Sequence, residues 1–157
     1  MGRNTQNGGR KRWNPWRHIG VHYPHIKVSC RHILPGTRRA SWTKHGIYID
    51  KTLDQVARRC ALAHEIVHLE RGPVPEHPQL ALVEERTVSV IAAQRLIPLE
   101  DLTEAVMWVD LSDPHELAEE LWVDPATLKI RLENLRPHEH DYITTELQLR
   151  QPWNTDN

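Results

Sequence analysis

The pattern His-Glu-Ile-Val-His at residues 64–68 matches H-E-x-x-H and constrains the fold more than any other feature of the chain. Two histidines four residues apart lie on one face of an α-helix, so both imidazoles can meet the same metal ion. The glutamate between them then projects beside the metal toward a bound water. The motif has this meaning only on a helix, and the flanking residues predict one that begins near Thr52 and ends at Arg71-Gly72-Pro73.

An accidental match is the alternative, because the chain contains 11 histidines. A capped helix with apolar flanks lowers the chance of such an accident. Two other His-Glu pairs act as internal controls. His115-Glu116 is followed by Glu119, and His138-Glu139 by Tyr142, at the position where the second histidine is needed. Neither control pair can supply the motif.

A hydrolytic zinc site needs a third protein ligand and leaves the fourth position to water. Glu84 and Glu85 lie in the apolar stretch 81–88 of the next predicted helix, which runs from Pro78 to Ile97. A carboxylate in such a stretch is costly to bury without a partner, and a metal ion would satisfy it. Periodicity does not decide between the two glutamates, since both have apolar neighbours three and four residues away. A solvated pair at the edge of the helix is the alternative reading.

A short sheet is expected before these helices and further helices after them. Alternation at Ile26–Arg31 and the run Gly46–Ile49 predict two strands, with turn chemistry at Leu34-Pro35-Gly36 between them. Residues suited to capping or to a first turn predict three shorter helices, at Glu100–Trp108, Pro114–Trp122 and Pro125–Leu135.

Charge is distributed unevenly along the chain. Residues 1–49 carry ten basic residues and no acidic one, whereas residues 50–157 carry the other 10 basic and all 21 acidic residues. This asymmetry indicates contact with nucleic acid or an acidic partner, or simply attraction between two parts of one molecule. Residues 1–19 lack an apolar period and are expected to form a disordered basic arm. The folded domain is expected at residues 20–136, followed by a polar tail at 137–157.

The sequence has no apolar run near the roughly 18 residues that a membrane span requires, and no signal segment at its start. Its two cysteines, Cys30 and Cys60, are too few for a disulfide framework. These features predict a cytoplasmic protein without membrane contact. Cys60 lies one turn before His64, but a fourth ligand would close the site to substrate, so a core thiol is the expected role.

Three segments together resemble the ImmA/IrrE family of zinc metallopeptidases: Gly46–Ile49, the histidine motif within Ala61–Leu69, and Glu85–Pro98. The second signature of that family reads E-x-x-A-x-x-F-A-x-x-L-L-x-P. Here it corresponds to Glu85, Val88, Ile91, Ala92, Arg95, Leu96 and Pro98. The sequence departs from it by Val for Ala, Ile for Phe and Arg for Leu. The register of this signature implies that Glu85 is the third ligand.

The resemblance implies an α+β fold in which a small antiparallel sheet packs on a zincin-like metal-binding helix and a mostly helical C-terminal part follows. It also implies a zinc-dependent endopeptidase, with Mn²⁺ left open as the metal. His64, His68 and Glu85 would hold the metal, and Glu65 would be the catalytic base. The implied substrate is a protein, a DNA-binding transcriptional repressor. The rival hypothesis is a non-catalytic, metal-stabilised regulatory module that binds a repressor or DNA.

The helices expected at residues 115–135 also describe a helix-turn-helix-like element. Its charge argues against direct contact with nucleic acid, because residues 113–135 carry six acidic and two basic side chains. The resemblance implies instead that the element packs on the catalytic core. His138, His140 and Tyr142 could polarise a carbonyl in a transition state, but their place in the polar tail favours a solvated role.

Overall fold

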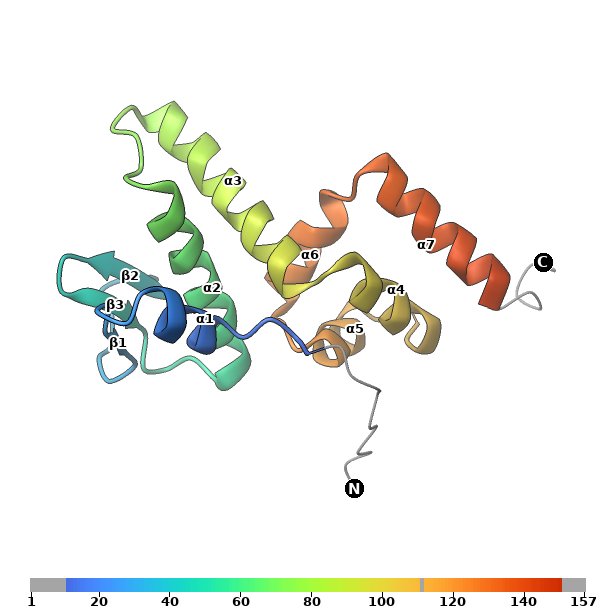
Figure 1. The fold of residues 1–157 in the computed structure, drawn as a ribbon, viewed down its shortest axis with the longest axis horizontal. Helices are drawn as coiled ribbons and strands as arrows, with labels where there is room; N and C mark the ends of the chain where they lie inside the picture. The colour runs from blue at the N-terminus through green and yellow to red at the C-terminus, as the bar shows by residue number, and fades with distance from the viewer. Residues whose placement is uncertain (1–10, 111, 151–157) are drawn as a thin grey trace, which may run out of the picture.

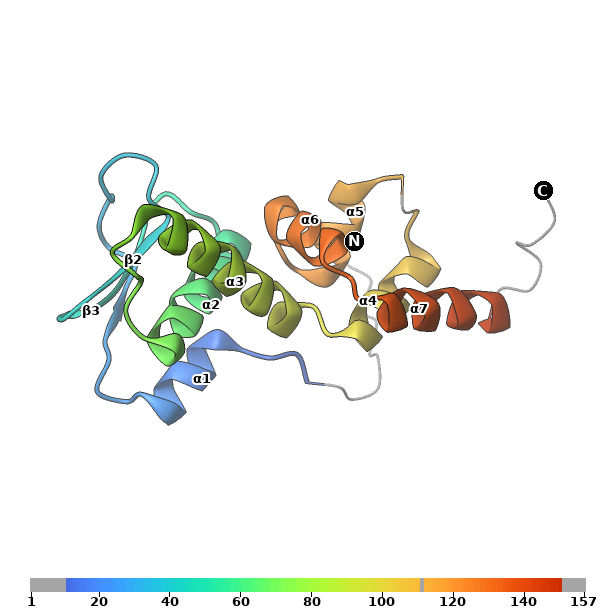
Figure 2. The same ribbon diagram turned by 90° about the horizontal axis from the view of Figure 1, so that it is seen from above.

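The computed structural model describes residues 11–110 and 112–150 of the chain. Helices dominate it, and a small sheet lies at one end, opposite helix α7 (Figures 1 and 2). This arrangement confirms the expected α+β class with a helical C-terminal part. The elements in chain order are α1 (Pro15–His22), β1 (Val28–Ser29), β2 (Ala40–Thr43), β3 (Gly46–Ile49), α2 (Gln55–Arg71), α3 (Pro78–Leu96), α4 (Leu99–Trp108), α5 (Pro114–Leu121), α6 (Pro125–Glu133) and α7 (Pro137–Arg150).

The sheet is mixed, and the expectation of a purely antiparallel sheet is wrong. The strand order is β1-β3-β2, with β3 parallel to β1 and antiparallel to β2. The reason is the hairpin of β2 and β3, in which Ala40 pairs with Ile49 and Thr43 with Gly46. The chain reverses direction between β1 and β2 and again at this hairpin, so β3 runs parallel to β1. Strand β2 therefore forms an edge of the sheet within the described residues.

Helix α2 lies at the centre of the molecule, between two apolar clusters. On one side Leu62 and Ile66 pack with Ile47 and Ile49 of β3. On the other side Ala63 packs in a second cluster with residues of α3, α4, α5 and α6. Burial on two sides explains why nine residues between Arg59 and His68 are buried with no single apolar stripe, which a surface helix would show.

The ends of α2 are set by local hydrogen bonds. Its N-cap is Asp54, whose side chain accepts a hydrogen bond from the Ala57 N–H at 2.8 Å. The expected cap at Thr52 is wrong, because its hydroxyl and its N–H both donate to the Asp50 carboxylate instead. The helix ends at Arg71 as expected, and Gly72 adopts a positive φ of 96° that few other residues tolerate.

The second half of the expected disordered arm is ordered, which corrects that part of the prediction. Helix α1 begins at Pro15, and Ile19 is only 4% exposed against α2 and the sheet. The Trp13 carbonyl also accepts a hydrogen bond from Arg59 of α2 at 3.2 Å. A few isolated large side chains make this contact, and they leave no periodic signal in the sequence. Residues 1–10 of the expected arm lie outside the described residues.

The polar tail is likewise ordered over its first part, where it forms α7. Glu139 is buried and pairs with Arg131 of α6, with Oε1 and Nη2 2.6 Å apart. Arg131 Nε also donates to the Ile97 carbonyl at 2.9 Å. The hydrogen bonds from Arg131 hold the pKa of Glu139 at about 2. A buried ion pair thus anchors a helix whose sequence is polar, and residues 151–157 lie outside the described residues.

Replacing Glu139 with alanine should lower the free energy of unfolding by about 3–5 kcal/mol, because Arg131 would keep its buried charge without a partner. The matched control is Glu133→Ala on α6, which removes an exposed pair with Lys129 and should cost well under about 1 kcal/mol. Because the pKa of Glu139 falls from its ordinary 4.5 to about 2, its contribution is present above pH 4.5. That contribution is lost as the pH falls through about 2. Urea titrations would contradict the prediction if both variants matched the wild type.

No helix among the described residues is both long and apolar enough to cross a membrane.

Candidate metal centre

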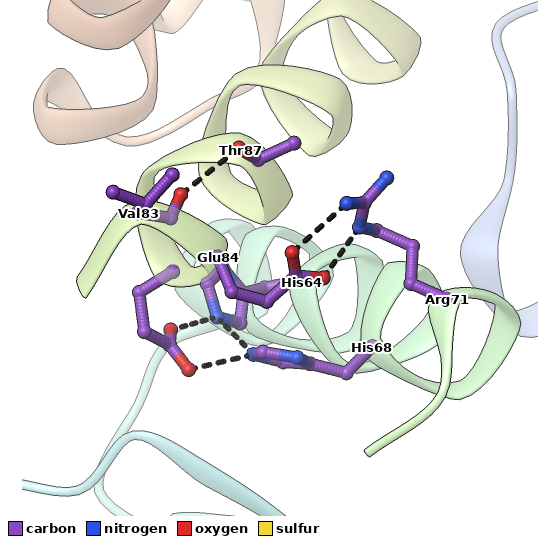
Figure 3. Close-up of polar contacts among 7 residues, drawn as sticks. His64, His68, Arg71, Val83, Glu84 and Thr87 are labelled. Carbon is purple, nitrogen blue, oxygen red and sulfur yellow. Dashed lines mark hydrogen bonds and ion pairs between the residues drawn. The ribbon is translucent and has the colours of Figure 1, made fainter. Parts of the chain in front are cut away.

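Helices α2 and α3 pack against each other and bring the three expected ligands together. His64 and His68 lie four residues apart on α2, and their Nε2 atoms are 3.1 Å apart (Figure 3). The Glu85 carboxylate on α3 reaches both rings, with 3.2 Å from Oε2 to His64 Nε2 and 3.1 Å from Oε1 to His68 Nε2. Two imidazole nitrogens and the carboxylate of Glu85 thus form one cluster of potential metal ligands.

Glu84 points elsewhere and does not join this cluster. Its two carboxylate oxygens accept hydrogen bonds from Arg71 at the end of α2, at 2.5 Å from Nε and 2.9 Å from Nη2 (Figure 3). This bidentate pair joins the end of α2 to α3. Of the two glutamates that periodicity could not separate, the structure therefore brings only Glu85 to the histidines. The role of Glu85 as a metal ligand stays a prediction.

The cluster fits a zinc ion in its distances and its chemistry. Zinc with bonds of about 2.0–2.1 Å in tetrahedral geometry needs its donor atoms about 3.3 Å apart. The two Nε2 atoms are 3.1 Å apart, and each lies 3.1–3.2 Å from one of the two Glu85 oxygens, which comes close to this value. Two imidazoles and one carboxylate suit zinc better than Mn²⁺, which prefers a set of oxygen ligands. Three protein donors also leave one position of the tetrahedron for water or substrate.

The surroundings of His64 favour the form of imidazole that binds metals. Burial lowers the pKa of His64, and the nearby His68 lowers it further, whereas Glu85 raises it. A lower pKa keeps the ring neutral at physiological pH, and only the neutral ring offers a lone pair to a metal.

Glu65 lies beside the cluster without being part of it. Its side chain is buried, with 8% of the residue exposed, and this burial raises the pKa of its carboxyl group. The Glu85 carboxylate raises the pKa further, while His68 and a hydrogen bond from the Trp42 backbone N–H lower it. A carboxylate with a raised pKa is better matched to proton transfer near neutral pH than an ordinary one.

His64, Glu65, His68 and Glu85 line a cavity of about 770 Å³. Its walls come from α2, α3, α6, strand β2 and the loop that follows α2. A volume of this size accommodates several residues of an extended peptide or a small ligand. The four residues expected from the sequence to do chemistry therefore face one shared space.

The helix-turn-helix-like element expected at 115–135 contains α5 and α6. Helix α6 packs on α3, and its residues Ala126, Thr127 and Ile130 line the cavity. In a DNA-reading element the second helix would present such residues to the major groove. Here they form a wall of the candidate site.

Cys60 also lines the cavity, but it does not reach the three ligand atoms. Its thiol is buried, burial raises its pKa, and Sγ accepts a hydrogen bond from the Asp124 N–H at 3.5 Å. This matches the expected core thiol. His138, His140 and Tyr142 lie on α7, and none of them lines the cavity.

Sequence reasoning missed one wall of the site, strand β2. Residues Arg38, Arg39, Ala40, Ser41 and Trp42 all border the cavity. Strand β2 is only four residues long and begins with Ala-Ser, so it shows no clear alternation. The available signal was the hairpin spacing, with two residues between Thr43 and Gly46.

The sequence was also compared with models of known protein families. A peptidase family model, described as the IrrE N-terminal-like domain, matches residues 26–133. The matched span includes the histidine motif, Glu85 and the part of α6 that lines the cavity. The chain belongs to this family. Searches of the curated proteins and of the solved structures found no match.

Membership in the IrrE N-terminal-like family confirms the resemblance inferred from the two sequence signatures. The chain thus contains a metallopeptidase-type domain of the ImmA/IrrE kind. Helices α1 (Pro15–His22) and α7 (Pro137–Arg150) lie outside the matched residues. Both nevertheless pack on the matched part, through Ile19 and Glu139 respectively.

Proposed function

We propose that this protein is a zinc-dependent endopeptidase that cleaves a DNA-binding transcriptional repressor. The observation that carries the proposal is the convergence of His64, His68 and Glu85 at 3.1–3.2 Å, with Glu65 buried beside them in the same cavity. Family membership supports the peptidase class. The repressor as substrate rests on the resemblance to ImmA/IrrE proteins, which are associated with cutting repressors.

His64, His68 and Glu85 would hold the zinc ion. When bound, zinc would supply a Lewis acid for the scissile carbonyl and for the attacking water. The Glu65 carboxylate would accept a proton from that water and then donate it to the leaving amine nitrogen. Its burial suits the first step, because a raised pKa makes the carboxylate a better proton acceptor.

The edge of β2 offers a place for the substrate backbone. The Asp50 N–H donates to the Arg39 carbonyl at 2.8 Å, so Arg39 directs its backbone groups toward β3. Backbone groups alternate along a strand, so those of Ala40 and Trp42 point away from the sheet. An extended peptide can add to such an edge through main-chain hydrogen bonds. The Trp42 N–H also contacts Glu65, which links this edge to the proposed base.

The test is to purify the protein without chelator, measure its metal content and incubate it with the repressor encoded nearest to its gene. We expect about one zinc per chain and cleavage at a defined peptide bond, read by mass spectrometry. Chelation should abolish cleavage and added zinc should restore it. A zinc-loaded protein that binds the repressor and leaves it intact would refute the peptidase proposal and favour the regulatory module.

A further inference from the structure

We propose that Arg38 forms an anionic subsite beside the candidate metal centre and selects substrates with an aspartate or glutamate close to the scissile bond. The inference rests on the proposed peptidase function, because it names the substrate class of the same cavity. Arg38 borders that cavity together with His64 and Glu65, and it precedes edge strand β2 by two residues.

The backbone that carries Arg38 is held in place on both sides. Before it, the Leu34 N–H donates to Asp50 Oδ2 at 2.7 Å. After it, the Arg39 carbonyl accepts the hydrogen bond from the Asp50 N–H at 2.8 Å. The buried Asp50 therefore fixes the turn that precedes β2. The Arg38 side chain is exposed, but its starting point at the rim of the cavity is defined.

The two neighbouring arginines differ in their partners. The Arg39 guanidinium pairs with the Asp124 carboxylate at the start of α6, at 2.6 Å. The Arg38 guanidinium has no such ion pair with any of the described residues. Of the two carboxylates near the metal centre, Glu85 contacts both histidines and Glu65 is buried. The charge of Arg38 is thus available to a ligand in the cavity.

The chain segment that carries Arg38 is mostly basic. Between residues 24 and 51 the acidic group is Asp50, which is buried and accepts hydrogen bonds from Leu34 and Thr52. The basic residues of this segment are all exposed, and they are Lys27, Arg31, Arg38, Arg39, Lys44 and Lys51. A basic segment of this kind attracts acidic peptides and repels basic ones. Of the two arginines that border the cavity, Arg39 is paired with Asp124, so specificity then comes from Arg38.

A nucleic acid would also be attracted to this surface, but the position of Arg38 favours a peptide. The site offers a free strand edge for a peptide backbone next to Arg38 and Glu65. Among the described residues that line the cavity, Trp42 is the one aromatic side chain apart from the two histidines, and Arg39 is already paired with Asp124. Single-stranded nucleic acids are usually bound by several aromatic side chains along a basic groove. Acidic peptides are therefore the class that we propose.

The experiment first identifies a cleaved peptide in a digested proteome library. Matched versions of that peptide then carry Asp, Asn or Lys at each position within three residues of the cut. Wild-type protein should cleave the Asp peptides with a kcat/KM about tenfold or more above their Asn counterparts. Arg38→Glu should reverse this preference toward Lys. The matched control is Arg31→Glu, which changes an exposed charge of the same segment that does not border the cavity and should keep the Asp preference. An unchanged Asp preference in Arg38→Glu would overturn the subsite.

Binding separates a failure of the subsite from a failure of the peptidase. The same peptides, labelled with a fluorophore, are titrated onto zinc-loaded Glu65→Gln protein and onto Glu65→Gln/Arg38→Glu. If Asp peptides bind more tightly than Asn peptides, and this difference disappears with Arg38→Glu, the subsite is supported. This holds even if the wild-type protein cuts no peptide, and only the proposed peptidase function then fails. Equal binding of both peptides overturns the subsite. Tighter binding of a DNA oligonucleotide, weakened equally by Arg31→Glu and Arg38→Glu, would overturn it in favour of nucleic acid.

Discussion

Glu65→Gln should lower the rate of repressor cleavage by a factor of about 10² to 10⁴ while the protein keeps its zinc. Glutamine preserves the size and most of the hydrogen-bonding shape of the side chain, but at neutral pH it cannot accept a proton from water. Metal content should not change, because Glu65 lies outside the cluster of His64, His68 and Glu85. Single-turnover cleavage assays and elemental analysis of the same preparation would measure both quantities.

The matched control for this variant is Glu119→Gln, which makes the same chemical change at an exposed position on α5 outside the cavity. It should cleave at the wild-type rate. A zinc-loaded Glu65→Gln protein that still inactivates its partner as well as the wild type would refute the role of Glu65 as base. That result would leave the binding-module hypothesis standing.

Glu85→Ala should weaken zinc retention by at least about 100-fold, whereas Glu84→Ala should retain zinc. Removing a residue that only hydrogen-bonds to a metal ligand typically lowers metal affinity by up to about 100-fold. Removing the ligand itself should lower the affinity at least as much. Glu84 is instead paired with Arg71, so its removal should change the contact between α2 and α3. Competition with a chromogenic chelator would measure the zinc affinity of each variant.

The pair of variants is informative because the two residues are adjacent on one helix and carry the same charge. If the Glu84 variant lost its zinc and the Glu85 variant kept it, the register of the family signature would be wrong by one residue. His64→Ala and His68→Ala should lose zinc in the same assay, because each removes one of the converging nitrogen atoms.

The helices were the most predictable part of the fold, because caps and prolines mark their ends locally. Helix α3 begins at Pro78 and α6 at Pro125, as expected from the sequence. The start of α2 was less predictable, since Thr52 and Asp54 are both suitable caps. The outcome depends on Asp50, which binds the Thr52 hydroxyl and N–H, and a pattern of residue types does not show that competition.

The sequence motif placed His64 and His68 on one helix, but the third member of the cluster depends on tertiary structure. From the sequence, Glu85 could be chosen over Glu84 only through the family signature. What separates them in the structure is the pairing of Glu84 with Arg71, which lies 13 residues earlier in the chain. The order of residues 15–22 and 137–150 was missed for a similar reason. A few contacts hold each helix, such as those of Pro15 and Ile19 in α1 and of Glu139, Ile143 and Leu147 in α7, and so few contacts leave no clear periodicity.

The participation of α6 in the cavity has a consequence for the newly synthesised chain. The three converging donors all lie between residues 64 and 85, on two helices that adjoin in the sequence. The opposite wall requires residues 126–130, which leave the ribosome about 40 residues later. Segments that emerge first can fold first. We expect a nascent chain to assemble its donors before α6 arrives, so the proposed zinc ion could be captured while the cavity is still incomplete. The docking of α6 is then the step that completes the proposed active site.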